Sequence, residues 1–131
     1  MKRRIISLVL ALTMLCAMAI SVSATTYEKY GSYTGSTGTC EYYIFGNFTS
    51  TQWSTTIEFQ SYTDSYLNYL FKVDVYVWPD DGFGGFNIPE PHYGVESTRI
   101  ASNGGTCSTA HHTDVNYYIN STKVDSKTFT F

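Results

Sequence analysis

The sequence predicts an all-β fold, a small antiparallel β-sandwich of about seven strands. Three observations support this prediction. After residue 24, apolar and polar residues alternate, and turn-forming residues recur about every 8–12 positions. No stretch there shows apolar residues at helical spacing, and Thr, Tyr and Val, which favour strands, are plentiful. Two packed sheets are the expected way for such strands to bury their apolar faces.

The first 24 residues have the three parts of a secretory signal peptide. Lys2, Arg3 and Arg4 form a cationic start, residues 5–20 are apolar, and small residues follow up to Ala24. The apolar run is shorter than the roughly 20 residues that cross a bilayer. We therefore expect cleavage near Ala24 and a mature chain that is secreted or held at the cell surface without membrane insertion.

The mature chain is acidic and has the length of one domain. Residues 25–131 keep five basic residues against 11 acidic ones, a formal charge of −6, because three of the eight basic residues lie in the signal. This charge argues against nucleic-acid binding, which needs Lys and Arg at the phosphates. We expect residues 25–38 to form a lead-in or an edge strand, and residues 39–131 to form the sandwich.

The cysteines predict one disulfide that closes the fold. Cys16 lies in the signal, so Cys40 and Cys107 remain as an even pair in a chain that we expect to be exported. Closing so long a loop stabilises by roughly 4 kcal/mol in the chain-entropy model. Metal binding by these thiols is disfavoured because the chain has no CxxC spacing. We expect no metal and no cofactor.

Alternation along the chain predicts which side chains face the core. The apolar face of the clearest strand comprises Leu67, Tyr69, Phe71, Val73, Val75 and Val77. Earlier strands place Cys40, Tyr42, Ile44 and Phe48 on one face, and Trp53, Thr55, Ile57 and Phe59 on another. Asn103-Gly104-Gly105 predicts a tight connection between a strand near 93–101 and one that begins near Thr106.

The last two strands allow a register to be predicted. Asn120-Ser121 has the character of a two-residue turn. Counting outward pairs Ile119 with Thr122, Tyr117 with Val124, and Asp114 with Lys127. That register leaves Phe129 and Phe131 on the polar face. Either a β-bulge near His111 and His112 corrects this, or another segment covers the face.

One aromatic and acidic patch is the candidate ligand-binding site. It comprises Tyr76, Trp78, Asp80, Asp81, Phe83 and Phe86, at the end of one strand and in the glycine-rich loop that follows. Aromatic planes stack on sugar rings, and carboxylates accept hydrogen bonds from sugar hydroxyls; the same groups can hold a peptide. The structural alternative is that Trp78 closes the end of the sandwich and the glycines only form a turn.

Catalytic and metal-binding patterns are weak. The chain has no G-x-S-x-G motif. Glu58 and Asp74 are a conceivable glycosidase pair, but both fall on strand faces that the pattern assigns to solvent. His111 and His112 are adjacent, so on a regular strand they point to opposite faces and cannot share an ion. We expect a protein that is not an enzyme.

These observations favour a secreted or cell-surface, non-catalytic domain that binds a glycan, a peptide or another protein. A carbohydrate-binding module that uses the aromatic patch is one alternative. A small secreted toxin or bacteriocin-like effector is another. In size and character the mature chain resembles the lactococcin 972-like bacteriocins, small exported β proteins of Gram-positive bacteria. The mature chain is small but longer than that family, and its two cysteines and its charge of −6 also differ from it.

Overall fold

A computed structural model of the chain describes residues 24–62, 69–80 and 88–131, which form eight strands and no helix. The all-β prediction is confirmed, with eight strands instead of about seven. The predicted signal peptide lies outside the described residues, except for Ala24. Within the described ranges, no helix of the length and hydrophobicity that a membrane crossing requires is present.

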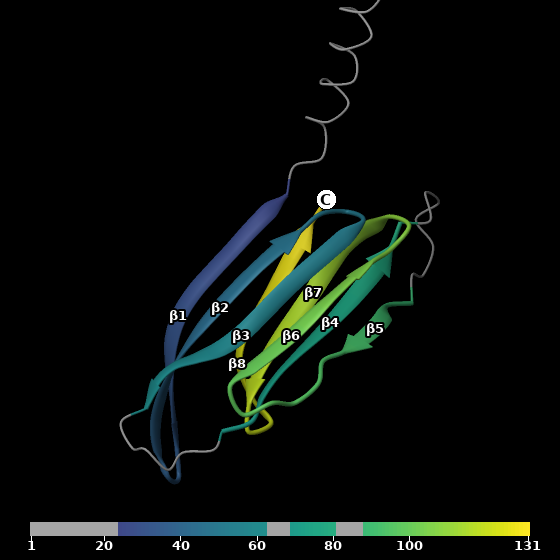
Figure 1. Cartoon of the computed structure of the whole chain (residues 1–131). Coiled ribbons are helices and arrows are strands. Elements are labelled where there is room, and N and C mark those ends of the chain that lie inside the picture. The colour runs from purple at the N-terminus through teal and green to yellow at the C-terminus, as the bar shows by residue number, and fades with distance from the viewer. Residues whose placement is uncertain (1–23, 63–68, 81–87) are drawn as a thin grey trace, which may run out of the picture.

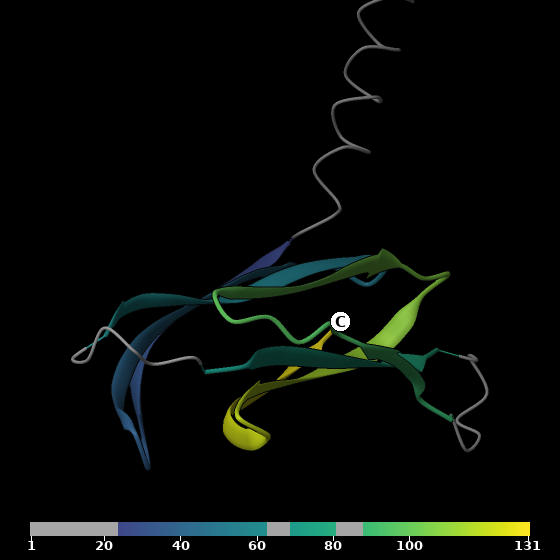
Figure 2. The same ribbon diagram turned by 60° about the horizontal axis from the view of Figure 1, so that its bottom comes forward.

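The strands form two antiparallel four-stranded sheets that lie one over the other (Figures 1 and 2). Sheet A has the order β1-β2-β3-β6, and sheet B has the order β5-β4-β7-β8. The strands of sheet A are β1 (Thr25–Gly35), β2 (Gly38–Phe48), β3 (Gln52–Tyr62) and β6 (Ile100–Thr106). Those of sheet B are β4 (Phe71–Pro79), β5 (Glu90–Tyr93), β7 (Ala110–Ile119) and β8 (Thr122–Thr130). The segment left open as a lead-in or an edge strand thus contains β1, an edge strand of 11 residues.

The inward faces of the two sheets form one core. In β4, Phe71, Val73, Val75 and Val77 are buried, as the alternation predicts. Aromatic residues fill much of the space between the sheets. Phe48 of β2 stacks on Phe129 of β8 with ring centroids 3.9 Å apart. Burial of such side chains is the main force that holds the sheets together.

Four glycines face into this core beneath aromatic rings. The pairs are Gly31 with Tyr42, Gly35 with Tyr69, Gly46 with Phe48, and Gly105 with Trp53. A Cβ at Gly105 would lie 2.5 Å from the Trp53 ring, closer than any real contact. The prediction that Asn103-Gly104-Gly105 forms a tight connection between two strands is wrong. These residues lie inside β6, where the glycine makes room for the ring of a neighbouring strand.

Asn103 joins the two sheets at one edge of the sandwich. Its Oδ1 accepts a hydrogen bond of 2.9 Å from Nε1 of Trp53. Its Nδ2 donates to the carbonyl oxygens of Val73 and His92, at 3.1 and 2.7 Å. Because Trp53 lies in sheet A and the two carbonyls belong to sheet B, this buried amide links both layers. We call this arrangement the Asn103 bridge.

The β7–β8 hairpin begins as predicted and then departs from the prediction. Asn120 and Ser121 have φ of 48° and 64°, the left-handed geometry of a two-residue turn, and Ile119 pairs with Thr122. Beyond that point the predicted register is wrong, because Tyr117 pairs with Asp125 and Asp114 pairs with Thr128. Val124 is the extra residue of a β-bulge between the Tyr118–Lys123 and Tyr117–Asp125 pairs. The bulge turns Phe129 into the core.

The same bulge directs Asp125 to the other edge of the sandwich. There its carboxylate accepts hydrogen bonds from the Tyr27 hydroxyl, at 2.5 Å, and from Nζ of Lys29, at 2.8 Å. Both donors lie on β1 of sheet A, whereas Asp125 lies on β8 of sheet B. We call this arrangement the Asp125 bridge. A side-chain bridge therefore joins the sheets at each of their two edges.

The predicted disulfide is wrong, because both cysteines are free. Cys40 pairs with Tyr62 at the last residue of β3, whereas the N–H of Cys107 bonds to the Thr51 carbonyl just before that strand begins. The 11 residues of β3 separate the two sites, a distance on the order of 30 Å at about 3.3 Å per residue. A disulfide requires Cα atoms within about 7 Å. Burial instead raises the pKa of both thiols.

Candidate functional site

Tyr76 and Trp78 project from the outer face of sheet B. They alternate on β4 with inward-facing valines, so neither contributes to the space between the sheets. Asp80 follows the strand, is exposed, and donates its backbone N–H to the Thr109 carbonyl at 3.0 Å. The remaining predicted residues, Asp81, Phe83 and Phe86, lie outside the described residues. The structure thus places two of the predicted aromatic residues on one face.

Trp78 is held by residues of the neighbouring strand β7. Its Nε1 donates a hydrogen bond of 2.8 Å to Oδ2 of Asp114. Its ring stacks on that of His112, with centroids 5.1 Å apart and an interplanar angle of 18°. The other carboxylate oxygen of Asp114 accepts a hydrogen bond of 2.6 Å from Thr128 of β8. Three adjacent strands therefore fix the ring and the carboxylate in one orientation.

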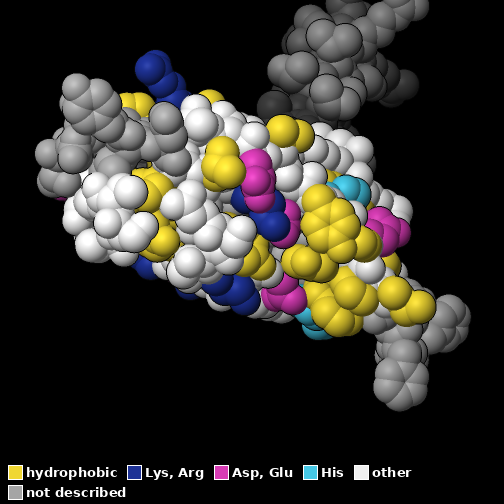
Figure 3. Space-filling model, turned by 90° about the horizontal axis from the view of Figure 1, so that it is seen from below, with side chains coloured by type: hydrophobic (Ala, Val, Ile, Leu, Met, Phe, Trp, Pro, Cys, Tyr) yellow, Lys and Arg dark blue, Asp and Glu magenta, His cyan; other side chains and the backbone are white. Residues whose placement is uncertain are grey.

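A second aromatic group lies next to this pair, towards the edge strand β5. Tyr93 is 70% exposed and meets Tyr76 edge to face, with ring centroids 6.2 Å apart. Burial, and then the proximity of Tyr93 and Asp74, raises the pKa of Tyr76. Ile88 and Val95, on either side of β5, are also exposed. Figure 3 shows hydrophobic side chains gathered at one end of the molecule, with His and acidic side chains among them.

Lys72 supplies a positive charge on the same face. Its Nζ lies 3.2 Å from Oδ2 of Asp74 and 4.6 Å from the centre of the Tyr118 ring. Burial alone would lower the pKa of Lys72, but the hydrogen bond and the negative charge of Asp74 outweigh it and raise this pKa. Asp74 also accepts the Gly94 N–H at 3.3 Å. The ion pair is therefore a fixed part of the surface.

The conceivable glycosidase pair is not assembled. Glu58 lies on β3 of sheet A and Asp74 lies on β4 of sheet B. Both point outward, so the whole sandwich separates them. Asp74 is also not solvent-facing as the pattern predicted: it is only 3% exposed and forms an ion pair with Lys72. Two carboxylates must flank one glycosidic bond to hydrolyse it, and these two cannot.

The two adjacent histidines do not point apart. β7 has an irregularity against β4, where Trp78 pairs with His112 but Pro79 pairs with Ala110, so His111 is an extra residue. The Nδ1 atoms of His111 and His112 consequently lie 2.9 Å apart. The expectation of opposite faces is wrong, because a bulge breaks the alternation of a strand. In the described part of the chain, no three His, Cys, Asp or Glu side chains gather as a metal site requires.

His112, Asp114 and Tyr93 complete the face, and the sequence did not indicate them. Trp78 pairs with His112, Tyr76 with Asp114, and Tyr93 with Asp74. The signal that identifies them is the register of β4 against its two neighbours, which requires knowing which strands are adjacent. Comparison with protein families, with curated proteins and with solved structures gives no match for this chain.

Proposed function

We propose that this chain is an exported, non-catalytic binding domain and that the outer face of sheet B holds a carbohydrate. The observation that carries the proposal is the Trp78 ring, fixed next to the Asp114 carboxylate on the same sheet face as Tyr76 and Tyr93. Aromatic surfaces pack on the apolar faces of sugar rings, and a carboxylate accepts hydrogen bonds from sugar hydroxyls.

The fixed orientation of these groups favours binding. Trp78 and Asp114 already hold each other, so little side-chain freedom is lost when a ligand arrives. Each carboxylate oxygen has two lone pairs, and each oxygen of Asp114 accepts one of the hydrogen bonds from Trp78 and Thr128. Acceptor capacity therefore remains for a sugar hydroxyl. Export rests on residues 1–24, independently of this face.

The proposal is tested by binding to an array of neutral oligosaccharides, followed by calorimetry on those that bind. We expect Trp78→Ala to weaken binding at least tenfold and Tyr93→Ala to weaken it about fivefold, the size expected for loss of one aromatic contact. Tyr30→Ala is the matched control. Tyr30 is 72% exposed, close to the 70% of Tyr93, but lies on the opposite sheet.

Binding should be unchanged in the control. Wild-type protein that binds no oligosaccharide would refute the proposal. Equal losses of oligosaccharide affinity in Tyr93→Ala and Tyr30→Ala would also refute it. They would show that binding does not depend on the outer face of sheet B in particular.

A further inference from the structure

The outer face of sheet A has a different charge from that of sheet B. Its outward-facing strand positions include the three carboxylates Glu28, Glu41 and Glu58, and no Lys or Arg among the described, paired residues. On sheet B, by contrast, Lys72 and Lys123 accompany the acidic residues. The paired outward positions of sheet A therefore carry charge of one sign, which attracts ligands of the opposite sign.

An aromatic row crosses this acidic face. Tyr30 of β1 stacks on Tyr43 of β2, with centroids 4.5 Å apart and an interplanar angle of 27°. Tyr43 in turn lies 6.5 Å from Phe45. The register places Glu58 of β3 directly beside Tyr43. The faces of such rings carry negative electrostatic potential and attract cations.

The acidic residues act directly on the Tyr43 side chain. Burial, the charge of Glu28, the neighbouring Tyr30, a hydrogen bond to Glu28 and the charge of Glu58 together raise the pKa of Tyr43. Two of these causes, the charges of Glu28 and Glu58, reflect negative potential at the ring. The same potential that opposes ionisation of the hydroxyl favours a positive charge brought to this place.

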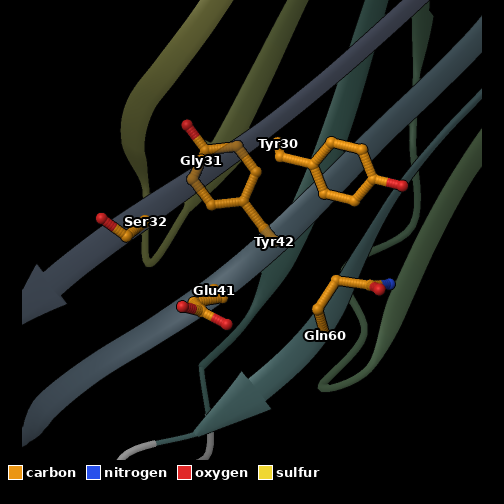
Figure 4. Close-up of a pocket in the computed structure, with 6 residues that line it drawn as sticks. All are labelled: Tyr30, Gly31, Ser32, Glu41, Tyr42 and Gln60. Carbon is orange, nitrogen blue, oxygen red and sulfur yellow. The ribbon is translucent and has the colours of Figure 1, made fainter.

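A hollow of about 480 Å³ opens next to the exposed Tyr30 (Figure 4). The other residues that line it are Gly31, Ser32, Glu41, Tyr42 and Gln60. At this place the pairing of β2 with β3 slips between Glu41 and Tyr42, which leaves Gln60 as a bulged residue. Figure 4 shows the Tyr30 ring and the Gln60 amide on one side of the hollow, and Ser32 and Glu41 on the other. Its volume lies within the range of small-ligand pockets.

We propose that the outer face of sheet A binds a basic peptide segment, with one Lys or Arg side chain in the hollow between Tyr30 and Glu41. The guanidinium or ammonium group lies over the face of the Tyr30 ring in a cation–π contact and pairs with Glu41. Glu58 attracts the next basic residue of the segment. This site lies on the opposite face from the proposed carbohydrate site and does not depend on it.

Charge distinguishes this ligand from the alternatives. A nucleic acid would be repelled by the three carboxylates. A neutral oligosaccharide carries no charge, so the negative charge of this face does not favour its binding. A lone metal ion is disfavoured, because no three acidic, His or Cys side chains come together as ligands in the part of the chain that the structure describes. A chain with several positive groups matches both the rings and the spacing of the carboxylates over three strands.

The test is calorimetric titration of the mature chain with an N-acetylated, C-amidated tetra-arginine peptide at low and at high salt. We expect binding that weakens steeply with salt, because the pairs are exposed. Tyr30→Ala and Glu58→Gln should each weaken it by about threefold, the size of an exposed cation–π or ion-pair contact. Glu96→Gln is the matched control, since Glu96 is an exposed carboxylate outside the strands of sheet A.

Retained affinity in Glu96→Gln together with losses in the other two variants supports the site. An equal loss in all three variants would overturn it, because it would show diffuse attraction to the net charge of the protein. Tight binding of tetra-glutamate, or no binding of tetra-arginine at low salt, would overturn it as well. Circular dichroism of each variant confirms that the sheets are retained.

Discussion

At the scale of single residues, Asn103 has the widest influence on the fold. It is a buried amide that satisfies three groups: the indole N–H of Trp53 and the carbonyls of Val73 and His92. Buried polar groups are costly unless they are hydrogen-bonded. The Asn103 bridge removes three such costs with one side chain. It also fixes the distance between β6 and the sheet B strands at an edge where the backbones themselves do not pair.

Asn103→Ala should therefore be strongly destabilising. We expect a loss of about 3 kcal/mol in the free energy of unfolding, because the indole N–H and two carbonyls lose their partners in a buried place. Urea unfolding followed by Trp fluorescence measures this, since Trp53 contacts the mutated residue. Asn116→Ala, on the outer face of β7, is the control and should cost less than about 1 kcal/mol. A small loss for Asn103→Ala would show that water replaces the amide.

At the scale of elements, β8 shows how one extra residue sets the position of a whole strand. From Asp125 onward, its pairing with β7 is regular up to Thr130. The Val124 bulge therefore determines that Asp125 and Phe129 face inward. Without a shift of one residue, every side chain in this half of the strand would face the other way.

Two single-residue deletions separate the effects of register and packing. Deleting Val124 removes the bulge but leaves the pairing of residues 125–130 unchanged, so we expect a loss below about 2 kcal/mol, mainly from the half-buried valine. Deleting Ser126 instead turns Phe129 outward and breaks its stack on Phe48. We expect this to cost about 3 kcal/mol or more, as for Phe→Ala in a core.

Chemical denaturation of both deletion variants provides the measurement. Similar stabilities for the two would contradict the assignment of the bulge to Val124. Hydrogen exchange at the β7–β8 backbone amides shows whether the pairing of residues 125–130 is preserved in the Val124 deletion.

At the scale of the whole molecule, the groups at the Asp125 edge make stability depend on alkaline pH. Burial raises the pKa of Tyr117 from 10.0 to about 12. Burial and the hydrogen bond to Asp125 raise the pKa of Tyr27, and that carboxylate also raises the pKa of Lys29. All three groups hold their protons more tightly when folded than when unfolded. Their stabilising contribution is therefore complete below the unfolded pKa values and is lost as pH rises through the folded ones.

We accordingly expect the free energy of unfolding to stay level up to about pH 10 and to fall between pH 10 and about 12. Urea unfolding at a series of pH values, with tyrosinate absorbance recorded in parallel, measures this. Tyr117→Phe should reduce the slope, since it removes one of the titrating groups. A stability that rises over this interval would contradict the arrangement at the Asp125 edge.

The sequence predicted which residues form strands better than it predicted which strands and side chains lie next to one another. The period-two pattern identified the inward face of β4 because each residue of a strand reports directly on the side that it faces. It could not show that Gly105 makes room for Trp53, because glycine is equally suited to a turn and the ring lies 52 positions earlier. The disulfide prediction failed for a similar reason. An even number of cysteines does not show that Cys40 and Cys107 lie at opposite ends of β3.

The candidate site was predictable to the same extent. Alternation placed Tyr76 and Trp78 on the outer face of β4, where the structure has them. It could not indicate His112 and Asp114, because they meet Trp78 only through the pairing of β4 with β7. The prediction for His111 and His112 failed because it assumed regular alternation, which the bulge at His111 interrupts.

The four glycine–ring pairs of the core have a consequence for how this chain can change over evolutionary time. At each of these places a ring occupies the volume that a side chain on the glycine would take. A larger residue at 105 is accommodated only where residue 53 becomes smaller, and the same reciprocity applies to positions 31 and 42. We therefore expect the two residues of each pair to be substituted together in related sequences.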